Sequence, residues 1–471
     1  MLNQTLQEKY PHLEIRVLKL SEVQKDNESK RIDSEFFKKE YFDAMETMQL
    51  NQVEYLGDNM KFNSRYSQPK YDETSKIKVI NSQYIRNEYI DYENAKSGYG
   101  KIVPKESVLI NATGVGTLGR VFINILDFDF SIDSHINVIV VKNKTYLNPY
   151  FLAIFLQSYY GQIQIIRYYS GTSGQIEIYP RDFNYFKIPI FPMEFQLEIQ
   201  NLVKDSHKAL EESKELYKKA EETLYLELGL DPKNPLQSLL DSKTNIPTNS
   251  LNISIRTLKE SFLKTGRLDS EYYQSKYEDI EKFIKSYPNG YDSFSNIINN
   301  KDTNFTPKNN ENYSYIELAN IGNNGNISEP ISDLGKNLPT RARRIVSKGD
   351  VIISSIEGSL SSCALITQEF DKHLVSTGFF VLNSKLLNGE TLLVMFKSQI
   401  FQEYLKKFPS GTILCAINKE ELSKILIPKI DPTTQEKIAK YIQESFNLRK
   451  KSKQLLDNAK NKVEEQIQGK T

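Results

Sequence analysis

The residues of this chain that could do chemistry do not combine into a catalytic site. Residues 114–119 (GVGTLG) have the glycine spacing of a dinucleotide-binding loop. Such a loop must open a helix whose N-terminus meets the pyrophosphate, whereas the following residues 120–126 (RVFINIL) favour another strand. The matching segment of the second half, residues 357–362 (EGSLSS), does not keep the glycines. We therefore interpret the glycine motif as the turn of a β-hairpin.

Metal ligands and activated nucleophiles are equally sparse. The four histidines include no i, i+4 metal pair, and no nucleophile stands in a motif with a general base. The two cysteines, Cys363 and Cys415, are too few for a disulfide framework or for a zinc cluster made by the protein alone. We expect a chain without a catalytic residue, a metal or a cofactor of its own.

Binding chemistry is better represented, because several predicted loops combine Arg, Asn, Gln and Tyr. Arginine makes bidentate contacts with guanine and neutralises phosphate, while Asn and Gln can pair with adenine. For any single residue, the alternative is an ordinary solvated loop side chain. The residues that we predict to contact DNA are Arg65, Tyr66, Gln83, Arg86, Arg167, Arg341, Arg343 and Arg344.

Length and composition indicate a multidomain globular protein with balanced charge. The chain has 471 residues, of which 39% are hydrophobic and 26% charged, and its formal net charge is +1. Nucleic-acid binding would therefore depend on local basic patches rather than on bulk charge. No apolar stretch approaches the ~20 residues that span a bilayer. The N-terminus lacks the apolar region of a signal peptide, so we expect a cytoplasmic protein with no membrane contact.

The sequence contains two copies of one domain-sized unit. RIDSEFF at residues 31–37 returns as RLDSEYY at residues 267–273, an offset of 236 residues (267 − 31). KIVPKESVLI at residues 101–110 corresponds to RIVSKGDVII at residues 344–353. This period is far longer than that of a solenoid repeat and is close to the size of a domain with an appendage. The repeat indicates one kind of task carried out at two places.

Each unit is predicted to be a mixed α/β domain, mainly of strands, with at least one internal helix. Short β-branched runs bounded by Gly, Asn, Asp and Ser are typical of strands, and they occupy residues 76–81, 108–111, 121–126 and 136–141. Asn148 and Pro149 are a helix start, and the apolar run YFLAIFLQSYYGQ follows them. Its counterpart in the second unit is ETLLVMFKSQIFQEYLKKF at residues 390–408.

Two long helices follow the two domains. Residues 194–228 contain no Gly or Pro, and apolar or small residues recur there in steps of three and four; residues 435–467 repeat this pattern. The pattern predicts an intramolecular antiparallel coiled coil, with each helix roughly 50 Å long at 1.5 Å per residue. The expected seam and partner-interface residues are Leu202, Tyr217, Leu224, Ile442, Leu456 and Val463.

The predicted fold class is therefore α+β. Two strand-rich α/β domains are separated by two long antiparallel coiled-coil helices, and the whole chain is a pseudo-twofold internal repeat. The predicted boundaries are 1–193 for the first domain, 194–230 for the first long helix, 231–252 for a linker, 253–430 for the second domain and 431–471 for the second long helix.

The order of these motifs resembles that of the DNA-specificity subunit of type I restriction–modification systems. The resemblance covers nearly the whole chain and is carried by RIDSEFF/RLDSEYY, SVLINATGVGTLGR/DVIISSIEGSLSS, SGTSGQIEI/SGTILCAIN and FKIPIFPMEFQLEI/ILIPKIDPTTQEKI. One departure is that the second unit lacks the glycines of TGVGTLGR. Contacts therefore cannot be transferred from the first unit to the second.

The resemblance implies two target-recognition domains, each reading one half of a split DNA sequence, with the paired helices as the ruler between them. The implied partners are double-stranded DNA, two modification (methyltransferase) subunits and a restriction or translocase subunit. S-adenosylmethionine would belong to the modification subunits. The alternatives are a detached specificity subunit of a related, type II-like restriction system, and a coiled-coil interaction scaffold with no role in DNA binding.

Overall fold

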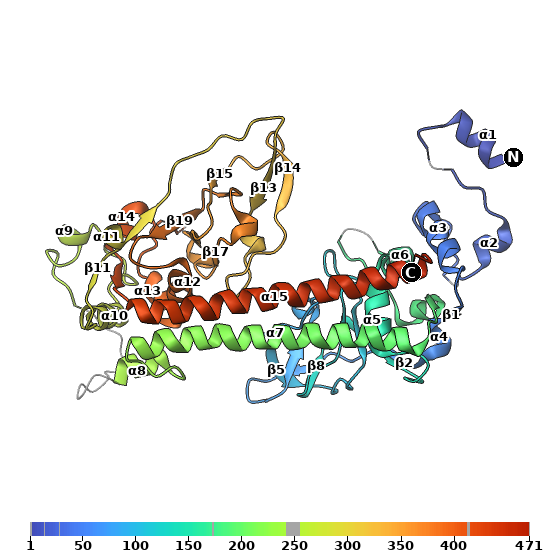
Figure 1. Cartoon of the computed structure of the whole chain (residues 1–471), viewed down its shortest axis with the longest axis horizontal. Helices are drawn as coiled ribbons and strands as arrows, with labels where there is room; N and C mark the ends of the chain where they lie inside the picture. Colours follow the sequence, from blue (N-terminus) through green and yellow to red (C-terminus); the bar gives the residue numbers. More distant parts are fainter. Residues whose placement is uncertain are drawn as a thin grey trace. The chain divides into compact units, whose positions relative to one another are not determined.

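The computed structural model describes residues 2–13, 15–27, 29–171, 174–241, 255–411 and 415–470 (Figure 1). The chain divides into two compact units. Unit 1 consists of Met1–Glu211 and Arg449–Thr471, and unit 2 of Glu212–Leu448. Each unit thus contains one strand-rich domain and one half of each of the two long helices.

Unit 1 is built on two four-stranded sheets. The first has the order β2-β9-β6-β7 with antiparallel neighbours, and its strands are Met60–Arg65, Ile136–Val141, Val108–Asn111 and Val121–Ile123. The second has the order β3-β5-β4-β8 with β4 and β8 parallel, and its strands are Lys70–Tyr71, Lys96–Tyr99, Lys78–Ile80 and Phe130–Ile132. All four predicted strands exist, although the first and third are shorter than predicted. A further pair, β1 with β10, joins Val53–Tyr55 to Lys187–Pro189.

The glycine motif is the turn of a hairpin, as predicted. β6 and β7 pair antiparallel, with Val108 opposite Ile123 and Ile110 opposite Val121, so residues 112–120 connect the two strands. Gly114, Gly116 and Gly119 have φ values of 91°, 79° and 82°. Residues with a side chain rarely adopt this conformation, which explains the three glycines without any nucleotide.

The predicted internal helix exists but is broken. α5 (Pro149–Gln157) begins after Asn148, whose side chain accepts a hydrogen bond from the Tyr150 N–H. Ser158 then has an extended backbone, its hydroxyl donates to the Phe155 carbonyl at 2.6 Å, and α6 (Tyr159–Tyr168) starts afresh. The single continuous helix predicted from the apolar run was wrong, because a serine that bonds the backbone interrupts a helix that hydrophobicity alone would continue.

Unit 2 repeats this plan with its own strands. Its first sheet has the order β12-β19-β16-β17, made of Ile298–Asn300, Phe379–Ser384, Val351–Ser354 and Cys363–Leu365. Its second sheet has the order β14-β13-β18-β15, made of Ile331–Leu334, Asn312–Ile316, Leu374–Ser376 and Ala342–Ile345, and again two neighbours, β13 and β18, are parallel. The helix break also recurs, since α12 (Gly389–Lys397) and α13 (Gln399–Leu405) flank Ser398. β11 (Tyr291–Ser293) pairs with β20 (Leu426–Pro428) as β1 does with β10.

The repeated arginine motif makes the same contacts in both units. Arg31 forms an ion pair with Asp33 at 2.7 Å and donates to the Tyr169 carbonyl at 2.7 Å, just after α6. Arg267 forms an ion pair with Asp269 at 2.7 Å and donates to the Phe408 carbonyl at 3.1 Å, just after α13. The motif therefore ties the start of each domain to the end of its second short helix.

A repeated glutamine ties each domain to its long helix. The Gln196 side-chain oxygen accepts from the Asn148 N–H at 2.7 Å, and the Gln435 oxygen accepts from the Asn388 N–H at 3.0 Å. The side-chain nitrogen of Gln196 donates to the carbonyls of residues 146 and 191, and that of Gln435 donates to the carbonyls of residues 386 and 430. The sequence repeat thus corresponds to one hydrogen-bond pattern formed twice.

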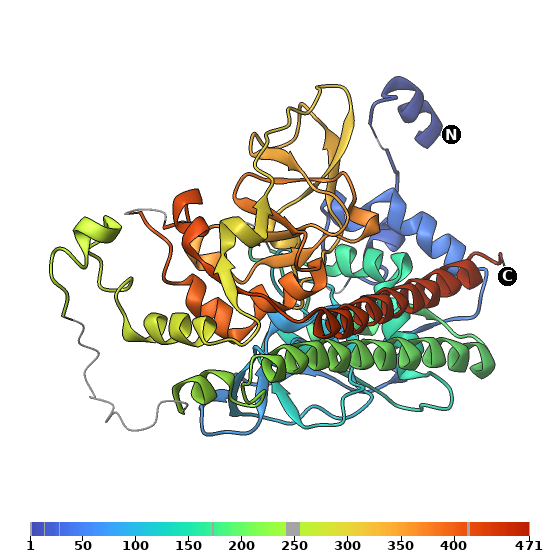
Figure 2. The ribbon, with the colours of Figure 1, turned by 60° about the vertical axis from the view of Figure 1, so that its left-hand side comes forward.

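The two long helices are α7 (Met193–Glu227) and α15 (Pro432–Ile467), and they run side by side in opposite directions within each unit (Figures 1 and 2). In unit 1 the hydroxyl oxygens of Ser206 and Ser452 are 2.9 Å apart, and in unit 2 those of Ser213 and Ser445 are 3.1 Å apart. α7 ends at Glu227, and Gly229, with a φ of 75°, lets the chain turn away just after it.

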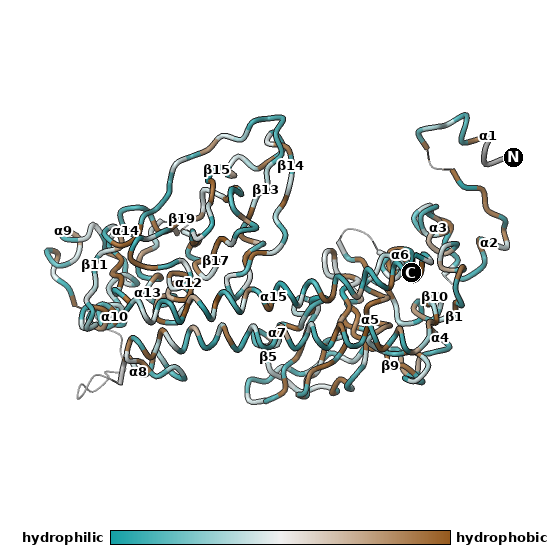
Figure 3. The backbone as a smooth tube through the Cα atoms, viewed as in Figure 1, coloured by the Kyte–Doolittle hydropathy of each residue, from teal (hydrophilic) through white to brown (hydrophobic). Residues whose placement is uncertain are grey.

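Hydrophobic and hydrophilic residues alternate along both helices (Figure 3). In unit 1, Val463 is fully buried in the domain core, and Leu202 and Leu456 pack against that core as partly buried residues. In unit 2, Tyr217, Leu224 and Ile442 are buried in one core. The predicted seam residues therefore face the interior of their own units.

The segment predicted as a linker, residues 231–252, contains a helix. α8 (Pro235–Asp241) lies in it, and Leu239 is buried in the core of unit 2. The prediction was wrong for this part because the Asn, Ser and Pro content of the segment hid a short apolar helix face. Residues 242–254 lie outside the described part of the chain. No helix among the described residues is long and apolar enough to cross a membrane.

We predict that Val463→Asp destabilises unit 1 by about 3–5 kcal/mol, because the new carboxylate would be buried without a partner. Urea denaturation followed by circular dichroism measures the loss. Asn458→Asp is the matched control, since it adds the same charge at an exposed position of the same helix. Equal stability of the two variants would contradict the buried seam.

Candidate nucleic-acid interface

At one end of the first sheet of unit 1, which we call its edge, polar residues from three neighbouring strands lie close together. β2 ends at Arg65, β6 ends at Asn111 and β9 begins at Ile136, and the registers of the strands put these ends side by side. The hairpin turn joins the same edge through a β-bridge between Thr113 and Glu177. This edge is where sequence-predicted residues and connecting loops come together.

Arg65 is held within this edge. Its guanidinium forms an ion pair with Glu177 and donates to the Ile178 carbonyl, and it lies 5.8 Å from the ring centroid of Tyr179. A guanidinium bound to a carboxylate has little charge left for a phosphate. The structure therefore gives Arg65 a role in holding the neighbouring segment that contains Glu177 and Ile178, and its contact with DNA stays a prediction.

Tyr66 belongs to the core rather than to an exposed loop. Its side chain is 6% exposed, so the predicted DNA contact by Tyr66 was wrong for this conformation. The Lys101 ammonium lies 4.7 Å from the ring centroids of both Phe62 and Tyr66, and Lys101 itself is exposed. Lys101 was not among the residues predicted to contact DNA. The alignment of KIVPKE with RIVSKG could have found it, since it places Lys101 opposite Arg344.

Gln83 and Arg86 lie on a surface loop of unit 1, as predicted. Gln83 is exposed in the short 3-10 helix η2 (Ser82–Tyr84), and Arg86 donates to the Gln83 and Ile85 carbonyls. Arg120, at the end of the hairpin turn, also donates to the Ile85 carbonyl, at 3.3 Å. Arg120 ends the motif TGVGTLGR and was not among the residues predicted to contact DNA.

Arg167 is buried, so its predicted place in a DNA-reading loop was wrong. It lies in α6 and is 4% exposed. Its guanidinium carbon is 3.8 Å from the Tyr41 ring centroid and 4.1 Å from that of Phe36, the geometry of cation–π contacts. Burial raises the pKa of Tyr41, and the Arg167 charge opposes this increase. The aromatic partners are more than a hundred residues away in sequence, so local composition could not reveal them.

The arginine cluster of unit 2 lies at the edge of a sheet. β15 (Ala342–Ile345) is the last strand of its sheet and contains Arg343 and Arg344, while Arg341 directly precedes it. Arg341 is exposed, Arg343 donates to the Thr340 carbonyl at 2.7 Å, and Arg344 donates to the Phe379 carbonyl. None of the three forms an ion pair with a described residue. Burial lowers the pKa of Arg344.

The same backbone edge carries different side chains in the two units. The bridges of Thr113 and Ser170 to Glu177 in unit 1 have counterparts in the bridges of Ile356 and Ser410 to Ala416 in unit 2. Glu177 pairs with Arg65, whereas Ala416 offers no charge. The two units therefore share the backbone geometry of this region but differ in the charge of its side chains.

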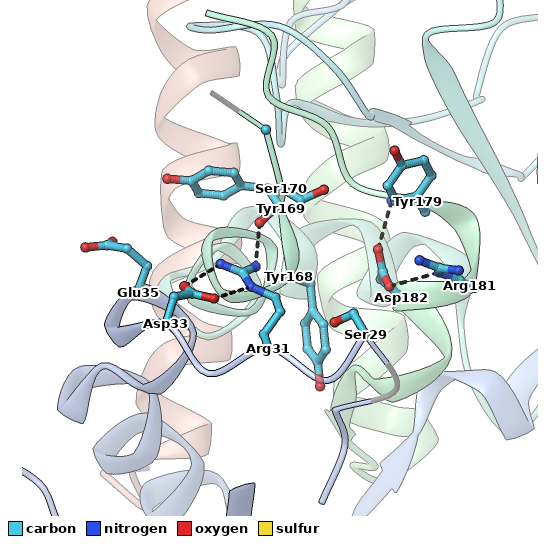
Figure 4. Close-up of a pocket in the computed structure, with 11 residues that line it drawn as sticks. Ser29, Arg31, Asp33, Glu35, Tyr168, Tyr169, Ser170, Tyr179, Arg181 and Asp182 are labelled. Carbon is cyan, nitrogen blue, oxygen red and sulfur yellow. Dashed lines mark hydrogen bonds and ion pairs between the residues drawn. The ribbon is translucent and has the colours of Figure 1, made fainter. Parts of the chain in front are cut away.

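A pocket of about 460 Å³ opens beside the arginine motif of unit 1 (Figure 4). Arg31 is saturated there by Asp33 and the Tyr169 carbonyl, and Asp182 lies 3.8 Å from Arg181. The hydrogen bond from Arg31 lowers the pKa of Asp33. These charges neutralise one another within the pocket. Within the described ranges, no group of three or more His, Cys, Asp and Glu side chains could hold a metal ion.

Part of the chain is similar to known proteins. Residues 43–222 match the family model of the type I restriction modification DNA specificity domain. The type I restriction enzyme HindI specificity subunit of Haemophilus influenzae is 30% identical over 159 residues. That alignment covers 33% of this chain and 33% of the relative, so the chain spans about a third of the length of the curated relative that it matches. Residues 43–222 are therefore similar to a type I DNA specificity domain, and about a third of the chain is similar to a type I specificity subunit.

Two solved structures align with most of the chain at low similarity. The S subunit of a type I restriction–modification system from M. genitalium has a TM-score of 0.41 and 14% identity, covering 88% of this chain and 95% of that one. The HsdS subunit from Thermoanaerobacter tengcongensis has a TM-score of 0.27 and 14% identity, covering 89% of this chain and 97% of that one.

We predict that Arg167→Ala lowers the free energy of unfolding by about 2 kcal/mol or more, because the aromatic side chains around it lose their buried cation. Arg341→Ala is the control, and a surface substitution of this kind is expected to change stability by less than about 0.5 kcal/mol. Thermal denaturation of the two variants gives the comparison. A stable Arg167 variant would mean that the aromatic cage does not depend on the guanidinium.

Proposed function

We propose that this chain is the DNA-specificity subunit of a type I restriction–modification system. In this role it recognises a two-part DNA sequence and directs methylation and restriction by partner subunits. The observation that carries the proposal is the match of residues 43–222 to the DNA specificity domain. The second unit supports it, because the arginine and glutamine contacts of unit 1 recur there outside the matched segment.

In the proposed arrangement, residues 1–193 and 253–430 are target-recognition domains and each reads one half of the DNA sequence. The support is that the two units have the same backbone bridges but different side chains there, such as Glu177 in one unit and Ala416 in the other. Two domains with the same fold but different surface side chains can bind two different half-sites. Gln83, Arg341 and Arg343 are exposed or unneutralised groups suited to this reading.

The long helices are proposed to form one antiparallel coiled coil that spaces the half-sites, with the two halves of the chain related by a pseudo-twofold repeat. α7 and α15 each continue from one unit into the other. Ser206 pairs with Ser452 and Ser213 with Ser445, and the members are seven residues apart on each helix. Both pairs therefore fit a single heptad register.

Catalysis is assigned to partner subunits. Two modification subunits would supply the methyltransferase site and bind S-adenosylmethionine, and a restriction or translocase subunit would join the same complex. The chain itself would contribute recognition and no active site. The support is the kinship with specificity subunits, together with a pocket whose charged groups are already neutralised by one another.

We predict that methylome sequencing of cells that carry the chain with its modification partner reveals a methylated motif in two parts. Replacing residues 1–193 with the corresponding domain of another specificity subunit should change one half of the motif and leave the other half intact. A host that carries the modification subunit alone is the control. The absence of any chain-dependent motif would reject the proposed function and favour a scaffold.

We predict that removing one heptad from each long helix shortens the spacer of the motif. Deleting residues 207–213 and 445–451 keeps Ser206 opposite Ser452, because seven residues leave each helix. The lost length is about 10 Å, or roughly three base pairs of DNA. Deleting residues 207–213 alone is the control and should abolish recognition by breaking the register. Full activity with an unchanged spacer would refute the ruler.

A further inference from the structure

Two arginines of unit 1 converge on one peptide oxygen. Nη1 of Arg86 donates to the Ile85 carbonyl at 3.1 Å, and Nη1 of Arg120 donates to the same oxygen at 3.3 Å. Nη2 of Arg120 also donates to the Gly116 carbonyl, at 2.7 Å. The two guanidiniums are therefore adjacent, although 33 residues (119 − 86) separate them in the sequence.

The paired charges have no counter-charge at contact distance. Neither Arg86 nor Arg120 forms an ion pair with a residue in the described part of the chain. Burial and the neighbouring Arg86 charge both lower the pKa of Arg120, while Glu88 attracts Arg120 from beyond ion-pair distance. Two adjacent cations repel each other, and an anion bound between them would remove that repulsion.

The loop that carries Arg86 is held in place by contacts with neighbouring elements. The Ile85–Ile90 bridge closes their loop, and the Asn87 side chain accepts from the Val121 N–H at 2.9 Å. Gln157 of α5 also donates to the Asn87 carbonyl, at 3.2 Å. The loop is thereby bound to β7 and to α5. Charges that are held in place before a ligand arrives lose less entropy on binding it.

The adjoining turn adds neutral donors. Val115 and Gly116 are exposed, and their backbone N–H groups donate no hydrogen bond to any residue that the structure describes. Gly116 has open space where a side chain would stand. Free backbone N–H groups beside two guanidiniums are the chemistry that binds an oxyanion.

The fold does not require these arginines. The Ile85–Ile90 bridge of unit 1 has its counterpart in the Ile321–Ile327 bridge of unit 2, where Gly322 stands in place of Arg86. The residue before β17 is Ser362, where unit 1 has Arg120 before β7. Since unit 2 folds on the same plan without either charge, the pair is available for binding.

We propose that Arg86 and Arg120 together bind one phosphate group of the DNA backbone, at the half-site read by unit 1. The inference rests on the proposed function, and it adds a phosphate-binding site that the first unit has and the second lacks. The shared peptide oxygen brings both cations to a single phosphate. Their contribution is therefore to position unit 1 on the duplex rather than to read a base.

The test uses the full chain assembled with its modification subunits and compares Arg86→Gln, Arg120→Gln and the double variant. Binding to the cognate duplex and to a scrambled duplex is measured over a range of salt concentrations. Each single variant should bind both duplexes roughly tenfold more weakly, because a charge-assisted hydrogen bond is lost. The double variant should bind both duplexes more weakly than either single variant, because both charge-assisted hydrogen bonds to the phosphate are lost. The slope of log affinity against log salt concentration should be shallower by about 0.9 in the double variant, which no longer neutralises that phosphate.

Lys105→Gln is the matched control, because Lys105 is an exposed cation of unit 1 that Asp127 neutralises at 2.7 Å, and it should bind as the wild type does. Wild-type affinity and salt dependence in the arginine variants would overturn the inference while leaving the proposed function intact. A loss confined to the cognate duplex would overturn it in favour of base reading. A wild-type complex that binds neither duplex would instead reject the proposed function, and the inference with it.

A second measurement separates DNA from free anions. The melting temperature of the full chain is recorded with and without inorganic phosphate. Stabilisation of the wild type that both arginine variants lose supports an oxyanion site at this pair. If that stabilisation is seen while DNA binding does not change in the variants, the site takes free phosphate and its assignment to the DNA backbone is overturned.

Discussion

A buried glutamine at the start of each long helix is the contact on which the architecture of both units depends. Gln196 is fully buried and Gln435 is 7% exposed, and each amide uses its oxygen and nitrogen to join the helix to the cap of a short helix and to two loop carbonyls. A buried amide left without partners costs about 1–3 kcal/mol, so the contact fixes one geometry. The direction in which each long helix leaves its domain follows from it.

Beyond this junction, the backbone is the same in both units, whereas the surface side chains differ. The paired arginine motifs, the broken helices at Ser158 and Ser398, and the bridges that end at Glu177 and Ala416 keep one scaffold in both units. The side chains at the sheet edges differ. The proposed recognition of two half-sites needs this separation, because changing which bases are read must not change how the domain is held.

The arginines show why composition alone overstates a binding surface. Arg31, Arg167 and Arg267 hold the fold through carbonyls, carboxylates and aromatic rings, and Arg65 holds the neighbouring segment through Glu177. Only arginines whose charge is not already satisfied can contribute fully to binding a phosphate. In a chain with a net charge of +1, the few unneutralised arginines matter more than the total number.

The sequence by itself determined the internal repeat, the two long helices, the hairpin at the glycine motif and the family resemblance, because these depend on local patterns of residue type and on order along the chain. It did not determine the break at Ser158, the helix within the supposed linker, or the burial of Tyr66 and Arg167. Only the tertiary structure decided these points. Burial and ion pairing depend on neighbours that are distant in sequence, such as Tyr41 beside Arg167 and the Ile85 carbonyl shared by Arg86 and Arg120.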